Sequence, residues 1–217
     1  MCGRNTIFSD RKTIKNELKV DIWKNEDDYT PSYNLSPTQL SPVLVKNEAR
    51  ALYSMRWGFG FQSKMRPIFN ARAESLSIKK SFKGLISRNR CIVLSNGFFE
   101  WKNDGNSKTP YFIHHDAGKI IQMAGLCKWD IDQNGKRKLV YTIITKEARS
   151  SLKDIHHREP VMLSENAASK WINVNTHSED PLSYLYDNTD RISSYEVTKF
   201  VNKSSNDSPE CIQRVLG

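Results

Sequence analysis

The chain has 217 residues, of which 38% are hydrophobic, enough to form a sizeable core in a single domain spanning residues 1–217. No apolar run approaches the length that a helix needs to cross a membrane, and the polar, charged first twenty residues lead us to expect no secretory signal peptide. Lys and Arg outnumber Asp and Glu by 33 to 24, and the net charge of +9 suits a polyanionic partner such as nucleic acid.

The predicted elements begin with a short amphipathic helix over residues 11–19, which places Ile14 and Leu18 on one face. Residues 29–37 are rich in Pro, Ser and Asn and predict a loop. Short β-type runs then follow in hairpin order, interrupted by helical patterns. The strands are predicted at 41–46, 51–55, 90–95, 98–102, 111–114, 120–126, 139–145 and 195–201, and the further helices at 72–87, 146–153 and 164–173.

Strands in hairpin order with a few helices at the edges predict an α+β fold. Its centre would be a curved, mainly antiparallel β-sheet or open barrel, with peripheral helices around it. The sequence contains neither a G-x-G-x-x-G nor a P-loop pattern, so we expect no nucleotide cofactor, and no other cofactor is indicated.

The four cysteines, Cys2, Cys91, Cys127 and Cys211, form no C-x-x-C pair, and their spacing predicts no disulfide framework. Free thiols persist in a reducing compartment, so we expect a cytoplasmic protein. Nothing in the sequence demands a second copy of the chain, and we expect a monomer.

Cys2 directly follows Met1, and a small second side chain favours removal of the methionine. Cys2 would then carry a free α-amine and a thiol on adjacent carbons, a 1,2-aminothiol that condenses with an aldehyde to a thiazolidine ring. An α-amine has a reference pKa of roughly 7.7–8.0, so much of it is nucleophilic at physiological pH. We expect the Arg4 cation to lower the pKa of the thiol. The alternative is that Cys2 belongs to a disordered terminus.

Residues 70–74 read Asn-Ala-Arg-Ala-Glu, in which small side chains separate three polar ones. Asn70 could hydrogen-bond an aldehyde or sugar oxygen, and Arg72 suits a phosphate. By itself, however, this segment favours an ordinary helix N-terminus that Asn70 caps.

Residues 97–101 read Gly-Phe-Phe-Glu-Trp, and a period of two places Phe99 and Trp101 on one face of a strand and Glu100 on the other. If it is buried, the Glu100 carboxyl has a raised pKa and can move protons, and Trp101 can stack on a base. By itself the strand favours a glutamate that faces water.

Residues 154–160 contain the adjacent pair His156 and His157, and imidazole donates and accepts protons near neutral pH. Neighbouring histidines point apart in a strand, and no carboxylate or cysteine lies at ligand spacing. We therefore expect no metal site.

Taken in order, the segments MCGR at 1–4, NARAE at 70–74, GFFEW at 97–101 and H-x-R-x-P at 156–160 resemble the SRAP family, the SOS response-associated peptidase proteins. Shorter segments at 33–37, 55–58 and 124–126 also match, so the resemblance spans nearly the whole chain. It implies the SRAP fold and a protein that recognises abasic sites in single-stranded DNA and forms a protective covalent DNA–protein crosslink. A bacterial protein that joins the nucleoid when bound to DNA is the implied setting.

By motif position, the resemblance implies a role for each site residue. Cys2 would form the crosslink, Asn70 would orient the opened sugar, Glu100 would position the Cys2 amine and manage its protons, and His156 would act as acid and base in ring opening and reversal. The DNA-binding residues implied are Arg4, Arg72 and Arg158 near phosphates, Trp57 and Trp101 on neighbouring bases, and Pro37 and Thr145 along the DNA path.

One departure from the family pattern is Glu159, which stands where the H-x-R-M-P segment has methionine. A carboxylate near a DNA groove would repel phosphate, so we expect Glu159 to point outward. Two other functions stay open. One is a cysteine peptidase that uses Cys2 with His156 and is limited to autoproteolysis, and the other is a non-catalytic single-stranded DNA-binding module.

Overall fold

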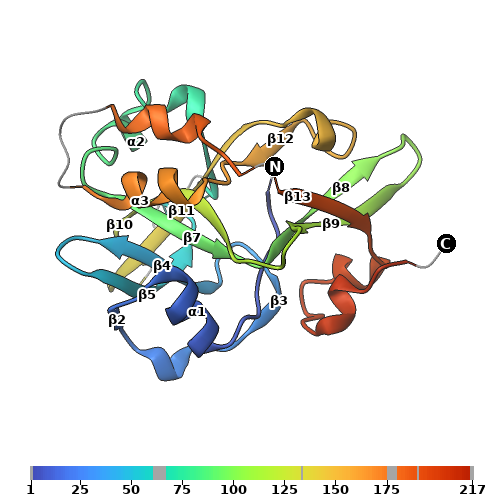
Figure 1. The fold of residues 1–217 in the computed structure, drawn as a ribbon, viewed down its shortest axis with the longest axis horizontal. Coiled ribbons are helices and arrows are strands. Elements are labelled where there is room, and N and C mark those ends of the chain that lie inside the picture. The colour runs from blue at the N-terminus through green and yellow to red at the C-terminus, as the bar shows by residue number, and fades with distance from the viewer. Residues whose placement is uncertain (1, 61–66, 133, 175–179, 190, 216–217) are drawn as a thin grey trace.

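Two β-sheets and three α-helices form the part of the chain that the computed structural model describes, residues 2–60, 67–132, 134–174, 180–189 and 191–215. The predicted α+β class is confirmed (Figure 1). The strands are β1 (Asn5–Ile7), β2 (Ile22–Trp23), β3 (Ser32–Leu35), β4 (Leu40–Lys46), β5 (Arg50–Trp57), β6 (Asn70–Arg72), β7 (Arg90–Ser95), β8 (Gly97–Asn103), β9 (Lys108–His115), β10 (Ile121–Ile131), β11 (Arg137–Glu147), β12 (Arg158–Pro160) and β13 (Ile192–Glu196). The helices are α1 (Arg11–Leu18), α2 (Lys80–Lys83) and α3 (Glu165–Ile172).

Five strands of the larger sheet close into a barrel. β4 pairs with β5 and β7, β7 pairs with β10, β10 pairs with β11, and β11 returns to β5. The last contact is parallel, through Tyr141 opposite Trp57, whereas the other four are antiparallel. The expected curved sheet is therefore confirmed, but the barrel is closed rather than open, because β5 and β11 pair across a long stretch of sequence.

The smaller sheet has the order β13-β9-β8-β1-β3, so the N-terminal strand β1 lies inside it. All three residues of β1 are buried, and side chains add to its backbone pairing. Asn5 Nδ2 donates to the carbonyl of Leu94 at 3.0 Å, and Thr6 Oγ1 donates to that of Gly97 at 2.8 Å. Buried, paired backbone polar groups hold a segment firmly in place. The residue that precedes β1 by three positions, Cys2, is therefore anchored rather than part of a disordered terminus.

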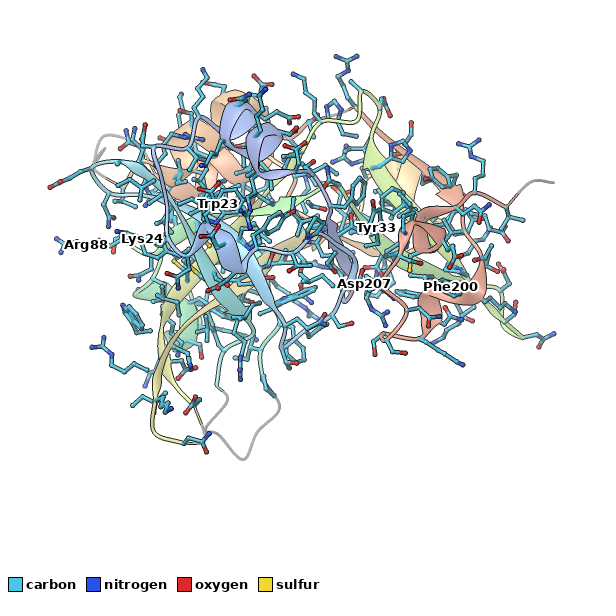
Figure 2. The ribbon with its side chains drawn as sticks, turned by 90° about the horizontal axis from the view of Figure 1, so that it is seen from below. Trp23, Lys24, Tyr33, Arg88, Phe200 and Asp207 are labelled. Atoms are coloured by element: carbon cyan, nitrogen blue, oxygen red, sulfur yellow. The ribbon has the colours of Figure 1, made fainter. Side chains whose placement is uncertain are left out.

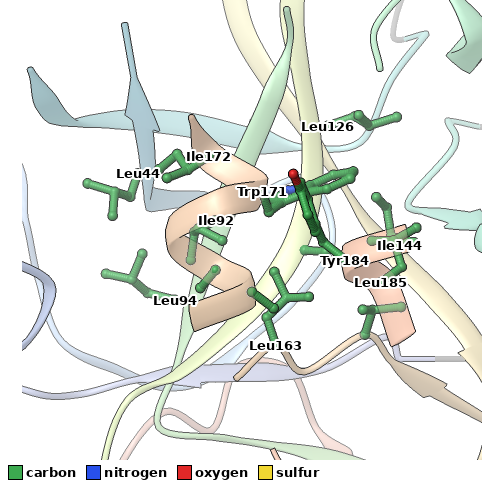
Figure 3. Packing of buried hydrophobic residues seen from close by; sticks show 14 of the residues in the cluster. Leu44, Ile92, Leu94, Leu126, Ile144, Leu163, Trp171, Ile172, Tyr184 and Leu185 are labelled. Carbon is green, nitrogen blue, oxygen red and sulfur yellow. The ribbon is translucent and has the colours of Figure 1, made fainter. Parts of the chain in front are cut away.

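Helix α3 covers one side of the barrel, as Figure 3 shows. Ser164 caps its N-terminus by accepting a hydrogen bond from the Ala167 N–H, and its apolar face buries Trp171 and Ile172 against residues such as Ile92 of β7. Trp171 is fully buried, and its one polar group is satisfied because Nε1 donates to the carbonyl of Cys91 at 3.0 Å. Within the described residues, no helix is long and apolar enough to span a membrane.

The C-terminal segment packs against the smaller sheet through two 3-10 helices, Lys199–Asn202 and Pro209–Ile212. Figure 2 shows Asp207 of this segment beside Tyr33 of β3, whose backbone N–H donates to the Asp207 carboxylate. Asn34 Nδ2 donates to carbonyls of the same segment, including that of Asn206 at 2.6 Å. These contacts fix the wall of the molecule next to β1.

The predicted elements differ from the structure where tertiary pairing overrides the local pattern. The expected loop 29–37 contains β3, which forms because β1 offers it a partner. The expected helix 72–87 is broken into a 3-10 helix, Ala73–Ser75, and the single turn of α2. The expected helix 146–153 begins inside β11 and reduces to the 3-10 helix Ser150–Leu152. The last strand, predicted at 195–201, coincides with β13 only at residues 195–196, because β13 ends at Glu196 and the 3-10 helix Lys199–Asn202 follows.

Gly97 opens β8, and a Cβ there would lie 2.3 Å from Phe112 Cζ and 2.7 Å from the Ile113 carbonyl oxygen. The backbone oxygen cannot yield without disturbing the β8–β9 pairing, so we expect Gly97→Ala to lower the free energy of unfolding by about 1–3 kcal/mol. Urea denaturation measures this. Gly84→Ala is the control, because a Cβ there meets nothing within 4 Å. Equal stabilities of the two variants would contradict the expected crowding at Gly97.

Candidate active site

Four residues predicted from the sequence, Arg4, Glu100, Trp101 and His156, line one pocket of about 810 Å³. Its walls are the β8–β9 hairpin and the loop that precedes β12, which are far apart in the sequence (Figure 1). The lining residues not predicted to act there are Asn103, Lys108, Lys153, Asp154, Ile155, His157 and Asn202.

Cys2 is fully buried in an apolar cluster that joins the two sheets and includes Phe98 and Tyr141. Its carbonyl accepts a hydrogen bond from Asn70 Nδ2 at 2.8 Å. Burial raises the pKa of the Cys2 thiol well above its ordinary value, and the negative charge of Glu100 raises it further. The thiol is therefore protonated at neutral pH. The expectation that Arg4 would draw it toward the thiolate is wrong, because burial outweighs any nearby cation.

The Arg4 guanidinium is directed toward the C-terminal segment. Its Nη1 donates to Asn34 Oδ1 at 2.8 Å and to the carbonyl of Val201 at 2.9 Å, and its Cζ lies 5.7 Å from the centre of the Trp101 ring. Trp101 Nε1 in turn donates to Asn202 Oδ1 at 2.8 Å. The Arg4 guanidinium and the Trp101 ring thus lie next to each other at the edge of the pocket, each held by hydrogen bonds to the C-terminal segment.

Glu100 is buried, with 4% of its surface exposed, so the glutamate does not face water. The predicted alternation along β8 is confirmed, since Phe98 packs in the Cys2 cluster whereas Phe99 and Trp101 pack in a separate cluster around Val201. Burial raises the pKa of the Glu100 carboxyl to about 7. A carboxyl with that pKa can both donate and accept a proton at physiological pH.

Asn70 lies in β6, which pairs in parallel with β11, Asn70 opposite Ile143. The interpretation of residues 70–74 as a helix capped by Asn70 is wrong, because the following 3-10 helix begins after Arg72 and receives no side-chain cap. Asn70 Oδ1 is buried and accepts no hydrogen bond within the described part of the chain. With Nδ2 bound to the Cys2 carbonyl, Oδ1 keeps its capacity to accept a hydrogen bond, although Asn70 itself does not line the pocket.

His156 stands on the loop before β12, its ring stacked on that of His157 at 4.3 Å between centres. Its Nδ1 lies 3.0 Å from the backbone nitrogen of Arg158 and 3.2 Å from the carbonyl oxygen of the same residue, so the Arg158 backbone orients the ring. Burial lowers the pKa of His156, which keeps the imidazole neutral at pH 7. Among the described residues, no three His, Cys, Asp or Glu side chains are grouped to hold a metal ion.

Two residues expected along the DNA path do not reach solvent. Trp57 is fully buried, stacks on Tyr141 and donates through Nε1 to the carbonyl of Phe69 at 2.9 Å, so it cannot stack on a base. Thr145 is also fully buried, because it faces the barrel interior from β11. Both expectations are wrong. A strand residue read in isolation does not reveal which face is covered.

The remaining DNA-binding expectations fall outside the pocket lining. Arg158 binds the Glu74 carboxylate with both terminal nitrogens, at 2.8 and 3.0 Å, and also donates to the carbonyl of Thr145 at 2.7 Å. Its guanidinium is therefore already engaged. Arg72 is exposed and Pro37 is half-buried.

Sequence reasoning missed the cationic rim of the pocket. Lys108 faces Asn103 across the β8–β9 hairpin, and Lys153 precedes His156 on the same loop. The signal for the first was the turn at Asp104-Gly105, where Gly105 has a φ of 86°, because it fixes which residues meet at the hairpin end. Nothing in the local sequence indicated that the loop bearing Lys153 folds over β8.

Glu159 was expected to point outward, and this is wrong. Its side chain is 2% exposed and forms a two-point ion pair with Arg149, from Nε at 2.9 Å and from Nη2 at 3.2 Å. The carboxylate can be buried here because the Arg149 guanidinium pairs with it and satisfies its charge.

Comparisons with known proteins identify the family of the chain. The chain matches the family model described as "SOS response associated peptidase (SRAP)" over residues 1–204, and it belongs to this family. It is 34% identical over 224 residues to "Abasic site processing protein YoqW" of Bacillus subtilis (strain 168), an alignment that covers 98% of this chain and 99% of that protein. It is 30% identical over 270 residues to "Abasic site processing protein HMCES" of Pongo abelii, covering 99% and 76% of the two chains.

A solved structure gives the same fold. A crystal structure of a protein from Bacteroides thetaiotaomicron superposes with a TM-score of 0.83 at 26% identity, covering 99% of this chain and 100% of that one. The family model, the relatives and the solved structure thus agree on the family and the fold, and both named relatives are described as abasic site processing proteins.

The raised pKa of Glu100 predicts how stability depends on pH. Its carboxyl titrates near 4.5 when unfolded and near 7 when folded, so the native state holds more protons between these values. The free energy of unfolding should therefore fall as pH rises from 4.5 to 7, by about 3 kcal/mol from this group. Glu100→Gln should remove that decline, so its free energy of unfolding should rise relative to that of the wild type between pH 4 and pH 8. Urea denaturation at a series of pH values measures this difference.

Glu165→Gln is the matched control, because the Glu165 carboxylate is exposed and its partner Lys119 lowers its pKa. The free energy of unfolding of this variant should not rise relative to that of the wild type as pH rises. Parallel pH curves for wild type and Glu100→Gln would contradict a Glu100 carboxyl that titrates near neutral pH.

Proposed function

We propose that the protein senses abasic sites in single-stranded DNA and captures them covalently as a thiazolidine on Cys2, once Met1 has been removed. The observation that carries the proposal is the placement of the buried Cys2 thiol within the electrostatic reach of Glu100. Burial raises the pKa of the Glu100 carboxyl to about 7, and Glu100 lines a pocket with a basic and aromatic rim. Neither that bond nor the preference for single strands belongs to the family description, and both rest on this chemistry.

The buried thiol favours attack by the amine first. A protonated thiol is a poor nucleophile, whereas an α-amine has a pKa of roughly 7.7–8.0 and is partly neutral at pH 7. The amine adds to C1′ of the ring-opened deoxyribose, and loss of water gives an imine. Sγ then adds to the same carbon while its proton passes to the imine nitrogen. Aldehyde and aminothiol thus yield one thiazolidine and one water, with no change in oxidation state.

Glu100 and His156 supply the proton transfers in this proposal. Glu100 receives a proton from the attacking amine and returns it to the departing hydroxyl, which its near-neutral pKa permits. His156 lines the pocket, and in this proposal its imidazole exchanges protons with the sugar hydroxyl and ring oxygen as the hemiacetal opens. Asn70 holds the Cys2 carbonyl through Nδ2 and offers Oδ1 to a sugar hydroxyl.

DNA would be held by the rim of the pocket. Lys108 and Lys153 offer positive charge to phosphates, Lys153 by exchanging its exposed ion pair with Glu147 for the phosphate. Arg4 adds its charge to the rim while its Nη1 stays bound to Asn34 and the Val201 carbonyl, and the half-buried Trp101 ring offers a stacking face. Arg72, exposed on β6, is placed to extend this contact. Sequence-independent contacts of this kind suit a sensor of a missing base, since no base edge is available to read.

A cysteine peptidase receives less support from the site. Peptide hydrolysis by a Cys–His pair needs a thiolate beside the imidazole. Burial raises the pKa of the Cys2 thiol, and the His156 ring is oriented by the Arg158 backbone. The same thiol suits the aldehyde reaction, in which it acts second and gives up its proton to the imine nitrogen.

The proposal predicts that the mature protein forms a heat-stable conjugate with single-stranded DNA bearing one abasic site, seen on a denaturing gel. Cys2→Ala should abolish it, because the ring cannot close without sulfur. Cys211→Ala is the control and should leave the yield unchanged, since Cys211 is equally buried but lies in the C-terminal segment. A heat-stable conjugate that persists in Cys2→Ala would contradict the proposal, as would its absence from wild type whose mass shows Met1 removed.

A further inference from the structure

The loop that carries His156 begins and ends at one point of the molecule. It leaves β11 after Glu147 and returns at β12, and its neck is closed by a hydrogen bond from the Ala148 N–H to the carbonyl of His157 at 3.0 Å. The residues between contribute a whole wall of the pocket, from Lys153 to His157. The placement of His156 against Glu100 thus depends on how this neck is held.

A buried ion pair spans the neck. Arg149 stands at the start of the loop and Glu159 just beyond its end, in β12 opposite Lys146. The Glu159 carboxylate receives three hydrogen bonds from Arg149, two from the guanidinium and one from the backbone N–H at 3.2 Å. A two-point guanidinium–carboxylate contact fixes orientation as well as distance.

The ion pair is also tied to the rest of the fold. Arg149 Nη1 donates to the carbonyl of Thr189 at 2.7 Å, and Lys146 Nζ lies 3.7 Å from Glu159 Oε1. Burying charges is costly and adds little net stability, so such a pair is weak evidence for a purely stabilising role. Its geometry instead links both ends of the loop to the segment before β13.

Inside the loop the anchors are the packing of Leu152 and Ile155 on the cluster that contains Cys2 and an exposed ion pair between Lys153 and Glu147 at 3.0 Å. The backbone N–H groups of Ile155 and His156 both donate to the carbonyl of Leu152 at 3.0 Å, and Leu152 is the buried apolar residue of this turn. The turn is therefore a small hydrogen-bonded unit that joins β11 at Arg149. Orientation of the unit relative to β8 is set at the neck.

We propose that the Arg149–Glu159 ion pair, with Lys146 and the Thr189 carbonyl, is a clamp that positions the His156 loop over the pocket. This inference rests on the proposed function for its kinetic consequence. Arg149 and Glu159 are positioning residues, since neither lines the pocket and both act through His156. Misplacement of a reacting group by about 1 Å costs on the order of 100-fold in rate.

A double-mutant cycle with His156 tests the clamp. Arg149→Met, measured as the single-turnover rate of conjugate formation at saturating abasic DNA, should lower that rate by about 10- to 100-fold. In a His156→Ala background the same change should have almost no further effect, because the group being positioned is gone. Arg11→Met is the matched control, since Arg11 forms an exposed pair with Asp27 and should leave the rate unchanged in both backgrounds.

A second measurement does not depend on DNA. Amide hydrogen exchange over residues 150–157 should quicken in Arg149→Met and, to a smaller degree, in Glu159→Gln, which keeps volume and one acceptor, while Arg11→Met matches the wild type. If Arg149→Met does not fold, Glu159→Gln replaces it in the cycle. An equal rate loss in both backgrounds, or unchanged exchange in the loop, would overturn the clamp. Quickened exchange with no conjugate from wild type would support the clamp and overturn the proposed function instead.

Discussion

Cys2 and Glu100 are buried together where the smaller sheet meets the barrel, and burial acts on both groups in the same sense. It removes water from a thiol and a carboxyl, and so raises the pKa of each. The thiol therefore stays protonated at neutral pH, and the carboxyl can both donate and accept a proton near pH 7. The order of bond formation in the proposed reaction, amine first and sulfur second, follows from this shared desolvation.

The strands of both sheets hold the site residues at that place. β1 pairs with β8 on one side and with β3 on the other, so the residue that precedes it is held near the carboxyl on β8. β6 reaches the same place from the barrel by parallel pairing with β11 and brings Asn70 to the Cys2 carbonyl. Backbone pairing fixes β1 to β8 and β6 to β11, and the hydrogen bond from Asn70 to the Cys2 carbonyl joins the two pairs. The imidazole alone arrives on a loop, and it is there that the structure adds a buried ion pair.

Much of this could be predicted from the sequence where the pattern is local. The alternation along β8 placed Glu100 opposite Phe99 and Trp101, and the strand β7 and helix α1 follow from their apolar periodicity. The motifs in order indicated the family. What failed depends on partners distant in the chain: the burial of Trp57 and Thr145, the inward carboxylate of Glu159, and the closure of the barrel by β5 and β11.

The pKa of the Cys2 thiol is the clearest case. Arg4 lies two residues away and suggested a thiolate, but a guanidinium follows the best hydrogen-bond acceptors within its reach. These are Asn34 Oδ1 and the carbonyl of Val201, supplied by β3 and the C-terminal segment. No local pattern predicts either contact. Sequence neighbours set what is possible at a site, and tertiary neighbours decide which possibility is realised.

The central claim is that both reacting groups of Cys2 end on one carbon of the abasic sugar. The most direct measurement digests the purified conjugate with nuclease and protease and treats the peptides with an amine label and a thiol label. We predict an N-terminal Cys2 peptide that carries the sugar remnant and takes up neither label at its α-amine or Sγ. A sugar remnant on a lysine, or on a Cys2 peptide whose thiol still accepts its label, would contradict the thiazolidine.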